Sequence, residues 1–76
     1  MSYIFIGNTS KKLNLTANKI YTDLPADKIT ELENRGLSLI KHLFIKPEKL
    51  NAAKAEIKQR GTVLNEALKQ MNHIGG

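Results

Sequence analysis

Residues 24–45 read LPADKITELENRGLSLIKHLFI, and most of the helix signals and candidate core residues of the chain meet in this stretch. Pro25 suits the first position of a helix, because its fixed φ matches the helix and its missing N–H would have no partner there. Asp27 then places negative charge near the positive end of that helix. Gly36 tolerates the positive φ that commonly ends a helix. We therefore expect a helix over residues 25–35 that stops at Gly36.

After Gly36 the apolar residues recur at steps of one to three, which suits a short helix buried on a broad face; they are Leu37, Leu39, Ile40, Leu43 and Phe44. Two interpretations fit this pattern. In the first, a helical turn runs through about Leu43 and is followed by an extended exit. In the second, residues 43–45 are extended and add a strand edge beside residues 3–6. We favour the first, because residues just before Pro47 lean toward extended conformations.

The N-terminal region contains three short β-type segments. Residues 3–6, YIFI, combine β-branched and aromatic side chains and end at a Gly-Asn turn signal. Residues 12–15, KLNL, alternate polar and apolar side chains, as a half-buried strand does. Residues 19–22, KIYT, form a third segment with Ile20 and Tyr21 on opposite faces. We expect a two- or three-stranded antiparallel element, which needs a helix packed on it.

The last helical region opens at Pro47 and carries one apolar stripe, formed by Leu50, Ala53, Ile57, Leu64, Leu68 and Met71. An unbroken helix from Pro47 to His73 would be about 40 Å long and would project from so small a domain. Alternatively, the helix breaks, with Gly61 as its C-terminal cap and Thr62 as the N-cap of a second helix over residues 63–71. We favour the break.

These patterns predict an α+β fold: a small two- or three-stranded antiparallel β element followed by two short helices and a long or broken C-terminal helix. We expect one small domain over residues 1–76, β-rich at 1–23, helical at 24–45 and again at 47–74. A chain of 76 residues without cysteine has a marginal core and neither disulfides nor thiolate zinc sites to support it. A partner protein or a second copy is the support that remains.

Twelve Lys and Arg residues against seven Asp and Glu give a net charge of +5, which favours contact with nucleic acid or with an acidic partner. Aromatic residues are too few for a base-stacking surface, so only phosphate-backbone contact is expected. The candidate nucleic-acid-binding residues are Lys11, Lys12, Lys19, Lys54, Lys58 and Arg60. We favour the alternative that the cations of the last region form a solvated helix face. Glu56 and Arg60 lie four residues apart, a spacing that predicts a surface ion pair.

No set of residues matches a catalytic, metal or cofactor site. His42 and His73 are far apart and have no cysteine or carboxylate at ligand spacing. Ser10 and Ser38 have no evident base partner, and the carboxylates fall on expected solvated helix faces. The apolar run at residues 3–6 is too short for a signal peptide or a membrane span. We expect a soluble cytoplasmic protein that is not an enzyme and has no cofactor, small-molecule substrate or membrane partner.

Three segments occur in order before a proline-started helix: YIFIG at 3–7, KIYTDLP at 19–25 and ELENRGLSLIKHLFI at 31–45. This order resembles small modules encoded among the structural genes of tailed bacteriophages and prophages. The resemblance spans about residues 3–65 and includes a T-x-L-P turn at 22–25 and an I-x-x-L-F helix end at 40–44. It implies a capsid- or neck-associated accessory protein, found in the cytoplasm of the producing cell or with the virion. It implies no functional residue.

A second resemblance is carried by E-L-x-x-R-G-L-S at residues 31–38, which is similar to the turn of SAP-type DNA-binding helices. The sequence departs from that family because the glycine-lysine element that should follow is missing. DNA binding in that mode is therefore not expected.

The leading functional hypothesis is a non-enzymatic phage or prophage structural or assembly protein that acts by protein–protein contact, with capsid or neck proteins or with itself. Its expected anchors are Ile57, Leu64, Leu68 and Met71, which a helix-in-groove or helix–helix contact would use. One alternative is a small basic module that binds the phosphate backbone of nucleic acid. Another is an adaptor or inhibitor of a host protein.

Overall fold

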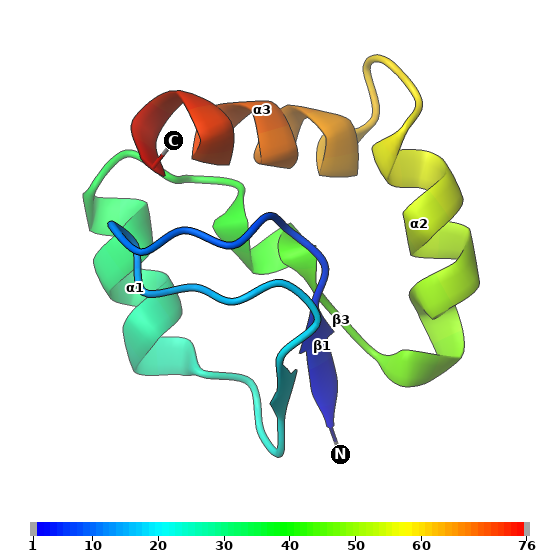
Figure 1. The fold of residues 1–76 in the computed structure, drawn as a ribbon, viewed down its shortest axis with the longest axis horizontal. Helices are drawn as coiled ribbons and strands as arrows, with labels where there is room; N and C mark the ends of the chain where they lie inside the picture. Colours follow the sequence, from blue (N-terminus) through cyan, green and yellow to red (C-terminus); the bar gives the residue numbers. More distant parts are fainter. Residues whose placement is uncertain (1, 76) are drawn as a thin grey trace.

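A small antiparallel sheet joins three segments that are far apart in the sequence (Figure 1). The computed structural model describes residues 2–75, in which β1 (Tyr3–Phe5) lies between β2 (Ile20–Tyr21) and β3 (Phe44–Ile45). One α-helix and one 3-10 helix lie between the second and third strands in the chain, and the remaining helices follow the third strand. The expected α+β class, with a two- or three-stranded antiparallel element followed by helices, is confirmed.

The strand expected at residues 12–15 is wrong, because residues 11–14 form a turn. Backbone hydrogen bonds close this turn: Ser10 N–H donates to Leu15 O at 2.8 Å, and Leu15 N–H donates to Ser10 O at 2.9 Å. Asn14 has a φ of 55°, a left-handed conformation that asparagine tolerates. The turn buries both Leu13 and Leu15. The alternating pattern therefore comes from a compact loop. The strand that follows β1 in the chain and pairs with it is β2.

The first helix is α1 (Ala26–Asn34), close to the expected bounds. Pro25 is its N-cap, with φ −77° and ψ 74°, whereas we expected Pro25 at the first helical position. The expected stop is confirmed, because Gly36 has a φ of +101°. Leu37 N–H donates to Leu32 O at 3.1 Å across this glycine, which is the bonding pattern of a Schellman C-terminus.

The 3-10 helix η1 (Ile40–Leu43) is followed by extended backbone at Phe44, so the helical turn with an extended exit is confirmed. That exit is β3, which pairs with β1 through Ile4 opposite Ile45 and Phe5 opposite Phe44. The strand edge of the second interpretation therefore exists at Phe44–Ile45, whereas Leu43 belongs to the helix. The 24–45 stretch supplies one helix, one helical turn and one strand of the fold.

The C-terminal region contains the 3-10 helix η2 (Pro47–Lys49), α2 (Leu50–Ile57) and α3 (Val63–Gly75). The expected break is confirmed, and Thr62 precedes the first residue of α3, but Gly61 is not the C-terminal cap of α2. The helix already ends at Ile57 with Lys58 as its C-cap, and Gly61, with a φ of +83°, lies in the connection that follows. A continuous helix is not formed, so no helical segment projects. In Figure 1, α3 (orange to red) instead spans one side of the molecule between α1 and α2.

The core brings all parts of the chain together. Its buried apolar residues are Phe5, Leu13, Leu15, Ile29, Leu32, Leu37, Ile40, Leu43, Phe44, Ala53, Leu64, Ala67 and Met71. Three of these come from α3, which packs against η1 and α2. Polar contacts add to this packing, since Leu39 N–H donates to Gln70 Oε1 at 3.0 Å. The C-terminal helix α3 is therefore part of the packed domain.

Candidate functional site

A surface groove of about 500 Å³ lies where α2 faces η1, β3 and the start of α3. It is lined by His42, Ile45, Lys49, Ala52, Ala53, Glu56, Val63 and Leu64. The apolar lining residues are Ile45, Ala52, Ala53, Val63 and Leu64. The polar ones are His42, Lys49 and Glu56, with an imidazole, an ammonium and a carboxylate group. A concave, mostly apolar surface with a few polar groups is the usual form of a binding site.

The face of η2 and α2 that lines the groove follows from helical spacing. Lys49, Ala52, Ala53 and Glu56 are separated by three, one and three residues, which places them on one side of a helix. Two of the four are alanines, so this face leaves space where larger side chains would fill it. Ala53 is buried against the core, and Ala52 is exposed. The small side chains of α2 thus create the hollow.

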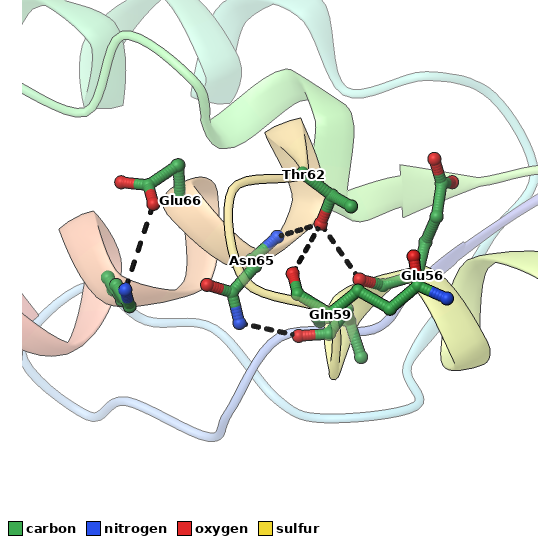
Figure 2. A network of polar contacts seen from close by, with 7 residues as sticks. Glu56, Gln59, Thr62, Asn65 and Glu66 are labelled. Atoms are coloured by element: carbon green, nitrogen blue, oxygen red, sulfur yellow. Dashed lines mark hydrogen bonds and ion pairs between the residues drawn. The ribbon is translucent and has the colours of Figure 1, made fainter.

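A polar network holds the α2–α3 connection that bounds the groove (Figure 2). The Thr62 hydroxyl lies 2.8 Å from Glu56 O and 3.0 Å from Gln59 O, the two carbonyls to which it can donate. The same oxygen accepts a 3.2 Å hydrogen bond from Asn65 N–H. Asn65 Nδ2 donates to Ile57 O at 2.9 Å. Side chains at the start of α3 therefore bind carbonyls at the end of α2 and in the connection after it, which ties the two helices together.

Val63 is the exposed apolar residue at the α3 end of the groove, with half of its surface (50%) open to solvent. Its neighbour Leu64 is only 7% exposed and belongs to the core. Ile45 on β3 is half-buried and forms the opposite wall. An apolar side chain inserted between Val63 and Ile45 would bury surface that the isolated chain leaves in water.

The apolar anchors expected from the sequence are mostly unavailable, which corrects that expectation. Leu64 and Met71 are 7% and 1% exposed, because α3 folds back on the core and does not project. Ile57 and Leu68 are half-buried, and Ile57 also packs against the core. Most of the predicted apolar stripe therefore packs within the domain. Only Leu64 among the four lines the groove.

The expected basic residues are all exposed, but they do not form one surface. Lys11 and Lys12 lie in the 11–14 turn, which is tied to α1 by a 2.6 Å hydrogen bond from Lys28 Nζ to Asn14 O. The other main group is carried by α2 and the connection after it. Figure 1 places α1 and α2 on opposite sides of the molecule.

The second basic group consists of Lys54, Lys58 and Arg60. The predicted Glu56–Arg60 pair is absent from residues 2–75, in which the ion pair found joins Lys69 and Glu66 at 3.7 Å. These three cations are therefore free to contact a partner. Lys19 is separate from them, with its ammonium 5.1 Å from the centre of the Tyr21 ring.

Within the described residues no group of three His, Cys, Asp or Glu side chains is arranged to hold a metal ion. His42 lines the groove and His73 lies exposed near the end of α3. Burial raises the pKa of the Tyr21 hydroxyl above its usual value of 10.0. The Tyr21 ring packs edge-on against Phe44, with 5.5 Å between the ring centroids. The raised pKa of Tyr21 therefore reflects the packing of its ring and not a reacting group.

Residues Ile45, Ala52 and Val63 were not singled out from the sequence as a site. The signal that would have found Ala52 is the helical spacing of Lys49, Ala52 and Glu56 beside the buried Ala53. Ile45 and Val63 belong to other elements, and only the fold brings them to the same groove.

No family model, curated protein or solved structure matches the chain. None of the helices found in residues 2–75 has the length and apolar character needed to cross a membrane. The functional conclusion therefore has to be drawn from the groove and from the distribution of charge.

Proposed function

We propose that the chain is a non-enzymatic assembly protein that acts through protein–protein contact at the groove between α2 and β3. The observation that carries this proposal is the groove itself, because Val63, Ala52 and Ile45 present apolar surface in a concave site. Contact with a partner removes that surface from water, which is the main favourable term in association. Polar groups at its rim, including Lys49 and Glu56, give such a contact its orientation.

The two serines considered as nucleophiles have structural roles, which supports a non-enzymatic function. Ser10 is buried, and its Oγ accepts a 3.2 Å hydrogen bond from Leu13 N–H inside the turn. Ser38 Oγ accepts a hydrogen bond from Gln70 Nε2 at 3.3 Å. Both hydroxyls thus help to hold the fold in place.

We further propose that the partner is a structural protein of a tailed bacteriophage or prophage, such as a capsid or neck protein. The support is the resemblance in segment order over residues 3–65, together with the small size and basic charge of the chain. The protein would then act in the cytoplasm of the producing cell or remain with the particle.

The test compares two exposed alanines of the same helix. Ala52→Gln places a polar side chain in the groove, whereas Ala55→Gln changes an exposed position of α2 outside it. We expect the wild-type chain and Ala55→Gln to co-sediment with particles from producing cells, and Ala52→Gln to remain in the supernatant. Equal sedimentation of both variants, or no sedimentation of the wild type, would contradict the proposal.

A second candidate is binding of nucleic acid through Lys54, Lys58 and Arg60, which are exposed and make no ion pair with the other residues of 2–75. Phosphate contacts of this kind weaken steeply with salt. If this mode operates, Lys54→Gln with Lys58→Gln reduces the affinity for duplex DNA and the slope of log K against log salt. Absence of DNA binding by the wild type at low salt would exclude it.

A further inference from the structure

The face of the sheet opposite Phe5 and Phe44, called the outer face below, carries a row of three isoleucines, of which Ile45 also packs against the core. Ile4 of β1 pairs directly with Ile20 of β2 on one side and with Ile45 of β3 on the other. Residues directly opposite each other in a sheet project to the same face. Phe5 and Phe44, one position along, face the core. Every strand of the sheet therefore contributes one isoleucine to the outer face.

This row continues into the groove. Ile20 is 65% exposed at the outer edge, Ile4 is half-buried in the middle, and Ile45 is both the end of the row and a wall of the groove. Beyond Ile45 the apolar surface passes to Ala52 and Val63. The result is one apolar track from the sheet edge to the start of α3.

The spacing of the row fits a helix laid across the strands. Neighbouring strands lie about 4.8 Å apart, so successive isoleucines are separated by about that distance. On a helix, side chains three or four residues apart are separated by about 5–6 Å. In an extended segment, side chains on one face repeat at about 6.6 Å, a poorer match. The track therefore suits the apolar stripe of a helix.

Charge indicates what kind of helix it accepts. The chain has a net charge of +5, and two cations adjoin the isoleucines of the track in sequence, Lys19 beside Ile20 and Lys46 beside Ile45. A second copy would bring the same positive charge to the contact, whereas an acidic helix would be attracted. Lys49 supplies a cation within the groove itself.

We propose that the track from Ile20 through Ile4 and Ile45 to Val63 binds the apolar face of an acidic amphipathic helix of the partner protein. This inference rests on the proposed protein-contact function and specifies the partner. The isoleucines supply the apolar contact, and Lys19, Lys46 and Lys49 attract the acidic side chains that flank it.

The experiment uses the full chain with labelled isoleucine methyl groups and three synthetic helical peptides. The first has leucines along one face and glutamates elsewhere; the second has lysines in place of the glutamates; the third keeps the glutamates and has serines in place of the leucines. We expect the first peptide alone to shift the methyl signals of Ile4, Ile20 and Ile45. Signals of the core residues Ile29 and Ile40 should stay in place.

Ile20→Thr provides the matched variant, because this exposed side chain contributes little to the core. It should weaken binding of the first peptide by about tenfold, on the order expected when one isoleucine is no longer buried. Shifts caused equally by the serine peptide would reflect charge alone and overturn the proposal. Shifts that depend on protein concentration without peptide would assign the track to self-association and overturn it too.

The two proposals can fail separately. If Ala52→Gln abolishes sedimentation with particles but no peptide shifts the isoleucine methyls, the protein-contact function stands and the acidic-helix partner is wrong. If the first peptide binds as expected but the wild-type chain does not sediment with particles, the partner class stands and the assembly function is wrong.

Discussion

Met71 of α3 packs against Gly7 so closely that a Cβ added to Gly7 would lie 2.9 Å from the Met71 Sδ. The same Cβ would lie 2.5 Å from Phe5 Cζ, which is also closer than real carbon contacts. Gly7 follows β1, so the missing side chain is what allows the C-terminal helix to sit on the N-terminal strand. This contact couples the two ends of the chain.

Gly7→Ala should destabilise the protein by about 1–3 kcal/mol, as expected for a methyl group forced into a packed core. Chemical denaturation measures the loss. Lys11→Ala, an exposed change in the turn that follows, should leave the midpoint unchanged. A Gly7→Ala variant as stable as the wild type would mean that α3 does not rest on this glycine.

Gly61→Ala tests the backbone of the α2–α3 connection without any steric clash, because nothing lies within 4 Å of a Cβ at this position. The φ of +83° should make alanine cost about 1–2 kcal/mol. Asparagine tolerates such a φ better, so Gly61→Asn should lose less. If thermal unfolding showed the same loss of stability for both variants, the left-handed backbone at Gly61 would not be the cause of that loss.

Thr62→Val removes the hydroxyl at the centre of the network in Figure 2 while keeping the shape of the side chain. We expect a loss of about 1 kcal/mol, typical of a lost N-cap. Thr62→Ser retains the hydroxyl and should lose less in the same denaturation experiment. A Thr62→Val variant as stable as the wild type, with a loss only in Thr62→Ser, would show that the methyl group matters and that the cap contributes nothing.

Stability should depend on Tyr21 at alkaline pH. Burial raises the pKa of its hydroxyl in the folded state, so the unfolded chain releases the proton first. The contribution of Tyr21 to the free energy of unfolding is therefore complete below the pKa that its hydroxyl has in the unfolded chain. It is lost as pH rises through the pKa of the folded state. Between about pH 9 and pH 11, Tyr21→Phe should lose less unfolding free energy than the wild type. The same pH dependence of stability in Tyr21→Phe and in the wild type would contradict the assignment.

The helices could be predicted because local signals determine their ends. Gly36 ends α1 where the sequence indicated, whereas Gly61 marks the break between α2 and α3 but lies beyond the end of α2 at Ile57. The strand at 12–15 could not be rejected in the same way. Leu13 and Leu15 are buried by a turn whose left-handed residue, Asn14, lies between them, and this places two apolar side chains at the spacing of a strand.

The candidate site was less predictable than the fold because it depends on which apolar residues the fold leaves exposed. Met71 and Val63 are both apolar residues of α3, yet Met71 is 1% exposed and Val63 is 50% exposed. Periodicity identified the stripe that contains Met71 and gave no reason to select Val63. The role of Ile4 depends on strand register, which the sequence did not specify because it suggested the wrong partner strand.

The central claim is that the groove beside α2 contacts a protein, and site-specific photo-crosslinking tests it most directly. Benzoylphenylalanine would be installed at Val63, and for comparison at the exposed Thr30 of α1, in cells that produce the protein. We expect a discrete adduct with one protein from Val63 and none from Thr30. Crosslinks to nucleic acid from Val63, or the same products from both positions, would contradict the claim.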